Sequence, residues 1–318
     1  MKLAVACLCY NQSSSPYLPE FLESLEIALA SAAAACLVLA GDNSDVEPFI
    51  NREIIAHHNL NSAFPARLIA FEKNLGFAAA YNRLIKMAEA EGCDYFLMLN
   101  PDMIVEPTAI TKLIEAICMK SELAAVCPKI YRWDFKGGKK TKIIDSCGIM
   151  MKPGLRFYDL GQGESDSGCY DNTKVFGPSG AAALFRLSAL DAIIENGQYF
   201  DERFFMYKED CDLAYRLNKA GLKTLFVPQA IMYHDRSAAS QGSILATLHN
   251  WRQRSRQTRI WSFVNQHLIF AKHLTNEGLY SHFIVYARIV FYFIFSLILA
   301  PFLLKSYPLI RRHYSDID

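Results

Sequence analysis

The sequence lacks the features that mark several common classes of protein. Its nine cysteines form no CxxC pair, so neither a zinc ribbon nor a disulfide framework is indicated, and this usage is typical of a reducing cytosol. A net charge of +1 excludes a strong general attraction to nucleic acid, and aromatic residues do not alternate with Lys or Arg as they would on an RNA-binding sheet. The chain does not open with a long apolar run and a small-residue cleavage site, so we interpret residues 2–9 as a strand and not as a signal peptide.

What the sequence does contain is an alternation of strand and helix patterns. The predicted strands are residues 2–9, 37–40, 67–71 and 95–99, and the predicted helices are residues 19–34, 77–91 and 107–120, with a turn at residues 11–15. Such alternation predicts βαβ units, and therefore an α/β fold with a mostly parallel sheet covered by helices on both faces. Residues 131–175 are rich in glycine and poor in apolar runs, so we expect an irregular excursion with short strands there. Residues 243–276 have a helical pattern.

Polar side chains follow the predicted strands at the point where each strand ends: Asn11, Asp42, Asn74 and Asp102. In open α/β sheets, ligands bind beyond the carboxyl ends of the strands. A carboxylate at position 42 can accept hydrogen bonds from a nucleobase or a ribose, and an Asx turn or a helix N-cap is the alternative explanation. Four such coincidences indicate a binding site at this edge of the sheet.

Three short motifs add candidates for that site. Gly76 in NLGFAAAYN permits close approach of a ligand to a helix N-terminus, which suits a diphosphate, although a plain strand-to-helix turn explains the motif equally well. Asp102 in NPD can bind Mg²⁺ or Mn²⁺ together with water and phosphate oxygens, or can belong to a simple turn. The small residues Ser179 and Gly180 leave room for a sugar or an acceptor, or permit close packing.

The segment from residue 200 to residue 234 concentrates three acids and a histidine. We assign Asp212 a structural role, because it lies four positions before Arg216 on the predicted helix. Asp210, at the start of that helix, has the position of a base that takes a proton from a hydroxyl group, with Glu209 beside it. His234 ends the next strand and can complete a metal site, although a lone histidine is more often structural.

In their order along the chain, these motifs resemble those of the inverting GT-A glycosyltransferases of family 2. The motifs are GDNSD, KNLGFAAAYN, LNPD, PSGAAALF, FDERFFMYKEDCDLAYRLNKAG and VPQAIMYH, and the match covers roughly residues 1–236. The resemblance is to the rhamnosyltransferase-like branch, which builds bacterial cell-surface polysaccharides. It implies a GT-A catalytic domain over residues 1–240. The helical pattern and the apolar run that follow predict a helical, membrane-associating region over residues 241–318.

The resemblance also implies a role for each candidate residue. Donor binding falls to Asn11, Asp42, Asn74, Gly76 and Asn100, the last standing where other branches carry the first Asp of the DxD motif. The metal ligands are Asp102 and His234, the catalytic base is Asp210 with Glu209 supporting it, and the acceptor or sugar pocket includes Ser179 and Gly180. The implied partners are a divalent cation, a nucleotide-diphosphate sugar such as dTDP-rhamnose, a lipid-linked saccharide acceptor and a membrane surface, and no nucleic acid.

The almost wholly apolar residues 283–304 are just long enough to cross a bilayer, but Arg288 lies among them and further basic residues follow. A full crossing would export those basic residues, against the positive-inside tendency. We therefore expect a helix that lies in the inner leaflet at the cytoplasmic face of the plasma membrane, as in a peripheral or monotopic protein. A helix docked on protein is the alternative.

Two other functions remain open at this point. A sugar nucleotidyltransferase can share the fold and the acids, but the loop CLCYNQSSS after the first predicted strand lacks the glycine and basic residues of its phosphate loop. A degenerate transferase that serves as a membrane scaffold is the other alternative, and the presence of Asp102, Asp210 and His234 argues against it.

Overall fold

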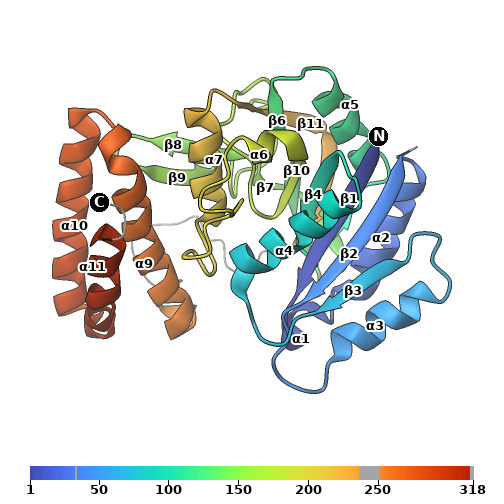
Figure 1. The fold of residues 1–318 in the computed structure, drawn as a ribbon, viewed down its shortest axis with the longest axis horizontal. Coiled ribbons are helices and arrows are strands. Elements are labelled where there is room, and N and C mark those ends of the chain that lie inside the picture. The colour runs from blue at the N-terminus through green and yellow to red at the C-terminus, as the bar shows by residue number, and fades with distance from the viewer. Residues whose placement is uncertain (33, 236–250, 316–318) are drawn as a thin grey trace.

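The centre of the fold is one nine-stranded sheet (Figure 1), seen in a computed structural model that describes residues 1–315 except 33 and 236–250. The strand order is β3-β2-β1-β4-β10-β6-β11-β5, and β7 pairs with the later half of β6. The strands of this sheet are β1 (Lys2–Cys9), β2 (Ala35–Asp42), β3 (Ala66–Ala70), β4 (Tyr95–Leu99), β5 (Met103–Val105), β6 (Leu123–Asp134), β7 (Lys139–Ser146), β10 (Ala182–Arg186) and β11 (Lys223–His234). A separate hairpin is formed by β8 (Ile149–Lys152) and β9 (Arg156–Asp159).

The first four predicted strands are confirmed as the parallel part of the sheet. Strand β1 pairs in parallel with β2 and β4, and β2 pairs in parallel with β3. Successive side chains of a strand point to opposite faces, and both faces of β1 are apolar, so helices must cover both. Leu3 and Val5 pack in the core with α2 (Leu18–Ala30) and α5 (Ala109–Cys118), whereas Ala4 and Ala6 pack with α4 (Gly76–Ala90). The predicted α/β class with helices on both faces is therefore confirmed.

Some elements differ from the prediction. The predicted turn at residues 11–15 contains one helical turn, α1 (Asn11–Ser14), and the helix α3 (Ile50–Asn59) was not predicted at all. Only three of the ten residues in α3 are isoleucine, the others being polar or alanine, so its apolar periodicity is too short to recognise. The predicted excursion over residues 131–175 does contain the short strands β7, β8 and β9, but residues 131–134 belong to β6, a long and mostly buried strand that was not predicted.

The C-terminal helices stand at one end of the molecule, beside α7 (Glu209–Lys219) and the β8–β9 hairpin (Figure 1). They are α9 (Arg256–His273), α10 (Leu279–Ile298) and α11 (Tyr307–Ser315), with short 3₁₀ turns between them; α6 (Leu187–Asp191) completes the helices named in the figure. Leu268 and Phe270 of α9 share one apolar cluster with Tyr215 of α7 and Leu155 of the hairpin. Helix α9 is thus packed directly on the helix that carries Glu209 and Asp210.

Candidate active site

Asn11 and Asp42 lie together at the carboxyl ends of β1 and β2, joined through Ser44. The backbone amide of Asn11 donates to Ser44 Oγ (2.8 Å), and that hydroxyl donates to Asp42 Oδ1 (2.5 Å). The other oxygen of Asp42 accepts from Arg52 Nε at 2.6 Å, and Asp42 is fully buried. Sequence analysis missed Arg52, because it lies on the unpredicted helix α3. The amide of Ser44 also donates to Asp42 Oδ1 (3.1 Å), which is the hydrogen bond of an Asx turn. The carboxylate is thus fixed at the sheet edge by an amide, a hydroxyl and a guanidinium.

The start of α4 is built as a close contact with the segment before α7. Asn74 Oδ1 accepts from the amide of Gly76 (2.9 Å), and the amide of Phe77 donates to the carbonyl oxygen of Phe205 (2.6 Å). Gly76 has a φ of +75°, and a Cβ there would lie 2.4 Å from the same carbonyl oxygen, so only glycine fits. These amides are thus occupied within the protein, and the helix dipole is what α4 offers to an anion.

Asp102 and His234 converge at the end of β4 and β11. Asp102 Oδ1 lies 3.2 Å from His234 Nε2, and His234 Nδ1 lies 2.9 Å from Asp145 Oδ2. Burial alone would lower the pKa of His234, but the two flanking carboxylates outweigh it and raise this pKa to about 10. Sequence analysis missed Asp145, which ends β7 and is fully buried; a lone acid between Ile144 and Ser146 gives little signal of a site.

This pair fits a divalent cation in part. An oxygen and a ring nitrogen face each other, and the second ring nitrogen is held by a buried carboxylate, which is the usual support of a metal-binding histidine. The described residues contain no group of three or more His, Cys, Asp or Glu that could hold a metal ion. The protein would therefore supply two ligands, and phosphate oxygens and water would have to supply the others.

Asp210 is held by two backbone amides in the first turn of α7. Its Oδ2 accepts from the amide of Gly180 (3.0 Å) and its Oδ1 from the amide of Cys211 (2.8 Å). A Cβ at position 180 would lie 3.1 Å from Asp210 Oδ2, which explains the small residue there. Ser179, directly before Gly180, is buried. The small-residue motif therefore serves to bring backbone amides to the carboxylate.

Two hydrogen bonds from backbone amides connect Asp210 to the segment that carries Asp102, the partner of His234. The amide of Asn100 donates to the carbonyl oxygen of Ala181 (2.9 Å), and Ala181 follows the Gly180 that binds Asp210. Asn100 is in turn two residues before Asp102, which contacts His234. The ends of β4 and β11 and the start of β10 therefore bring a carboxylate base candidate and a cation-binding candidate to one edge of the sheet.

Glu209 is buried without a polar partner for Oε2 in the described part of the chain. Burial, together with the charge of Asp210, raises the pKa of Glu209 well above its usual value. Burial thus favours the neutral form of Glu209, which can donate a hydrogen bond but is not a base. Of the two adjacent acids, Asp210 is therefore the one suited to accept a proton.

Asp212 lies in a buried cluster of opposite charges that includes more than the expected partner. Arg216 Nε lies 2.9 Å from Asp212 Oδ2, as the sequence indicated, and Lys272 Nζ and His273 Nε2 each lie 2.8 Å from Oδ1. Burial alone would raise the pKa of Asp212, but these three groups outweigh it and hold the pKa well below its usual range. Since Lys272 and His273 belong to α9, the cluster ties α9 to the middle of α7.

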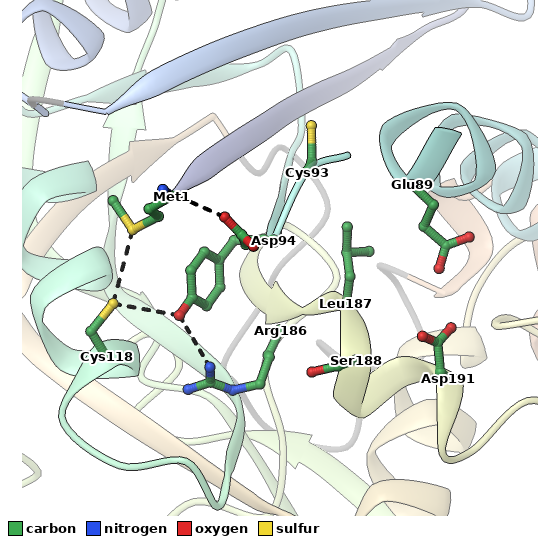
Figure 2. Close-up of a pocket in the computed structure, with 10 residues that line it drawn as sticks. Met1, Glu89, Cys93, Asp94, Cys118, Arg186, Leu187, Ser188 and Asp191 are labelled. Carbon is green, nitrogen blue, oxygen red and sulfur yellow. Dashed lines mark hydrogen bonds and ion pairs between the residues drawn. The ribbon is translucent and has the colours of Figure 1, made fainter. Parts of the chain in front are cut away.

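A separate pocket lies at the opposite edge of the sheet and contains none of the candidate residues. Figure 2 shows it around Arg186, between the start of β1 and the end of β10. Arg186 donates to Tyr95 Oη (3.1 Å) and to the carbonyl oxygen of Ile117 (2.7 Å). Because this guanidinium ties β4, β10 and α5 together, we interpret its role as structural.

The chain resembles characterised rhamnosyltransferases in sequence. It is 27% identical over 269 residues to the N-acetylglucosaminyl-diphospho-decaprenol L-rhamnosyltransferase of Mycobacterium tuberculosis, which covers 74% of this chain and 76% of that protein. It is 27% identical over 208 residues to the rhamnosyltransferase WbbL of Escherichia coli K12, covering 62% of this chain and 74% of that protein.

Solved structures share the fold. The mannosyltransferase PcManGT from Pyrobaculum calidifontis, in complex with GDP-Man and Mn²⁺, has a TM-score of 0.51 at 14% identity, over 97% of this chain and 73% of that one. GalNAc-T7 with UDP, GalNAc and Mn²⁺ has a TM-score of 0.55 at 14% identity, over 96% of this chain and 58% of that one. These likenesses support the predicted GT-A fold.

Family models agree with both comparisons. The model of "Glycosyl transferase family group 2" matches residues 162–310. The model of "Glycosyl transferase family 2" matches residues 5–194, which is more than half of the chain. This protein therefore belongs to glycosyl transferase family 2, and within that family it resembles the rhamnosyltransferases.

Proposed function

We propose that this glycosyltransferase moves rhamnose from a nucleotide diphosphate, with dTDP-rhamnose as the first candidate, to a lipid-linked saccharide during synthesis of a cell-surface polysaccharide. The activity for which the M. tuberculosis relative is named supports the sugar and the lipid-linked acceptor. The observation that carries the proposal is the arrangement of Asp210, Gly180, Asn100, Asp102 and His234 along one sheet edge.

The proposed reaction is one displacement with inversion. The acceptor hydroxyl oxygen attacks the anomeric carbon while the bond from that carbon to the diphosphate oxygen breaks, and the bonding electrons leave with the diphosphate. The hydroxyl proton passes to Asp210, whose carboxylate is oriented by the amides of Gly180 and Cys211. Asp102 and His234 would hold Mg²⁺ or Mn²⁺, which offsets the charge of the leaving diphosphate when bound.

The parts of the nucleotide-sugar donor would bind in sequence along the carboxyl ends of the strands. Asn11 and Asp42 at the tips of β1 and β2 would contact the nucleoside, with Asn74 and Gly76 at the start of α4 near the diphosphate. Asn100 would lie between the donor and Asp102. Ser179 and Gly180 would border the sugar, and Glu209 would donate a hydrogen bond toward the acceptor.

A thermal-shift screen tests the donor proposal. Purified protein is heated with each nucleotide sugar, with and without Mn²⁺ or Mg²⁺, and a bound donor raises Tm by linkage. We expect dTDP-rhamnose to give the largest rise, and that rise to need the cation and to disappear in Asp102→Ala. If no nucleotide sugar changes Tm, the scaffold alternative is favoured instead.

Asp145 is expected to support cation binding through His234. Asp145→Ala removes the acceptor for His234 Nδ1, so the ring is free to reorient and its basicity falls; we expect Mn²⁺ binding to weaken by about 10- to 100-fold. Free Mn²⁺ is measured by electron paramagnetic resonance in a titration of the protein. Asp134→Asn, which changes an exposed aspartate on the neighbouring strand β6, is the control and should bind as the wild type does. Equal Mn²⁺ affinity in Asp145→Ala and the wild type would contradict this role.

We also propose that residues 1–240 form the catalytic part, that residues 241–318 associate with the membrane, and that the protein works at the cytoplasmic face. Helix α10 is the one helix in the described ranges that is long and apolar enough to cross a membrane, and 17% of its most apolar window is buried. Two of its polar residues, Ser281 and Arg288, face the protein. Arg288 Nη1 donates to the carbonyl oxygen of Gly154 (2.6 Å), and the amide of Gly154 donates to Ser281 Oγ (3.2 Å).

The outward face of α10 is apolar over its whole length. Its exposed apolar residues are Leu279, Tyr280, Phe283, Tyr286, Val290, Phe291, Phe293, Ile294, Leu297 and Ile298. A helix with polar residues inward and apolar residues outward is suited to lie along lipid. Because Arg288 and Ser281 tie α10 to the turn between β8 and β9, an upright crossing would separate it from the protein, and we favour a helix lying in the membrane plane. The nine unpaired cysteines suit the cytosol.

Charges on that face are expected to release the protein from lipid. The double variant Phe283→Glu with Phe291→Glu removes two large apolar side chains that are 73% and 60% exposed. Burying one such side chain contributes about 1.5–3 kcal/mol, so binding to vesicles of phosphatidylcholine and phosphatidylglycerol should weaken at least ~10-fold in a sedimentation assay. Leu60→Glu, at a position 76% exposed at the end of α3, is the matched control and should bind normally. Unchanged binding of the double variant would favour the protein-docking alternative.

A further inference from the structure

The turn before α7 holds two non-glycine residues in the left-handed region. Tyr207 has a φ of +74° and Lys208 a φ of +70°, and Glu209 and Asp210 follow directly. Side chains with a Cβ disfavour this conformation because the Cβ approaches the following carbonyl oxygen. Such residues persist only where the surrounding structure holds them, and they concentrate at functional sites.

Asn265 of α9 holds this turn. Its Nδ2 donates to the carbonyl oxygens of Met206 (2.8 Å) and Tyr207 (2.7 Å), so the amide group bridges two consecutive carbonyls. The side chain is almost fully buried, at 2% exposed. Four residues earlier on α9, Trp261 packs against Phe205 with ring centroids 4.9 Å apart. One face of α9 therefore contacts residues 205–207, directly before α7.

The same helix also fixes the residues on the other side of Asp210. Lys272 and His273 contact Asp212, two positions after Asp210. Asp210 is thus bracketed by α9 contacts, the turn before it and Asp212 after it. The segment before α7 also contacts the start of α4, because the carbonyl oxygen of Phe205 accepts a hydrogen bond from the amide of Phe77.

We propose that Asn265 is a positioning residue for the catalytic base. By bridging the carbonyls of Met206 and Tyr207 it keeps Tyr207 and Lys208 left-handed, which aims Asp210 at the amide of Gly180 and at the acceptor hydroxyl. Without the bridge the turn relaxes to a more common conformation and the carboxylate moves away. This inference rests on the proposed role of Asp210.

Glycine at position 208 separates positioning from simple packing. In Asn265→Ala we expect kcat for sugar transfer to fall by about 10- to 100-fold, while KM for the donor changes by less than about threefold. Adding Lys208→Gly makes the left-handed conformation intrinsically accessible, so the double variant should recover about tenfold. Adding Lys208→Ala instead removes the same side chain but keeps the Cβ, and should recover nothing. Equal effects of glycine and alanine would overturn the proposal.

A readout that does not depend on activity keeps this test separate from the proposed function. Hydrogen exchange of the amides at 205–211, followed by mass spectrometry, should be at least ~10-fold faster in Asn265→Ala than in the wild type. If Asn265→Ala does not fold, Asn265→Ser, which keeps one donor, takes its place. Unchanged exchange overturns the positioning role even if the wild type transfers sugar. Faster exchange in a protein that transfers no sugar would instead contradict the proposed function alone.

Discussion

Asp210→Asn is expected to lower kcat for sugar transfer by about 10³-fold, near the middle of the range for the loss of a general base. Asparagine has the size of aspartate but cannot take the proton of the acceptor hydroxyl. The single oxygen of asparagine can still accept from one of the two backbone amides, of Gly180 or Cys211, and the other amide loses its partner. Since only this local bond is lost, the fold and the KM for the donor should change little. Steady-state kinetics with a saturating acceptor measure the effect.

Two comparisons make this result specific. Glu209→Gln replaces a carboxyl whose neutral form burial favours, so we expect a loss of less than about tenfold. Glu115→Gln neutralises an exposed acid on α5 and should match the wild type. A variant Asp210→Asn that folds and transfers sugar at nearly the wild-type rate would show that another group is the base.

Asp212→Asn is expected to lower the free energy of unfolding by about 3–5 kcal/mol, the usual effect of removing one partner from a buried ion pair. Asparagine keeps the shape but removes one negative charge from the buried cluster. Arg216 is then left with Glu195 at 3.8 Å, while Lys272 keeps its pairs with Asp201 and Glu195. Chemical denaturation monitored by circular dichroism measures the loss. Glu115→Ala, which breaks an exposed pair with Lys112, should cost less than about 1 kcal/mol.

The same cluster sets a pH dependence. The pKa of Asp212 is lower in the folded protein than the ordinary value of 3.8, so the folded state favours the ionised form. The contribution of ionised Asp212 to the free energy of unfolding is fully present above the pKa of the unfolded chain. It is lost as the pH falls below about 4 toward the pKa of the folded protein. Wild type should therefore lose stability in that window more steeply than Asp212→Asn. Parallel slopes for the two proteins would contradict the cluster as the source.

Local patterns were enough to predict the sheet core and the residues of its edge. The strand Tyr95–Leu99 has the predicted bounds because a short apolar run is closed by turn residues on both sides. Asp102, His234 and Asp210 were found because each follows or begins a recognisable element. Their mutual arrangement needed the structure, since it depends on the pairing of β10 between β4 and β6.

What could not be predicted depends on contacts between distant parts of the chain. Asp145 reaches His234 from β7, 89 positions away, and nothing in its local sequence indicates that partner. Asn265 looks like any polar residue of a helix until its contact with Met206 and Tyr207 is seen. In the sequence, Arg288 complicates a full crossing of the bilayer; the structure shows that its side chain turns inward to Gly154 and leaves the outer face apolar.

The most direct test of the central claim is a transfer assay with defined products. Purified protein is incubated with dTDP-rhamnose, Mn²⁺ and a polyprenyl-diphosphate saccharide in vesicles, and the product is analysed by mass spectrometry and by NMR of the anomeric centre. We predict one added rhamnose with the anomeric configuration opposite to that of the donor, formed about 10³-fold more slowly with Asp210→Asn. A product that retains the donor configuration, or no transfer from any nucleotide sugar, would contradict the account.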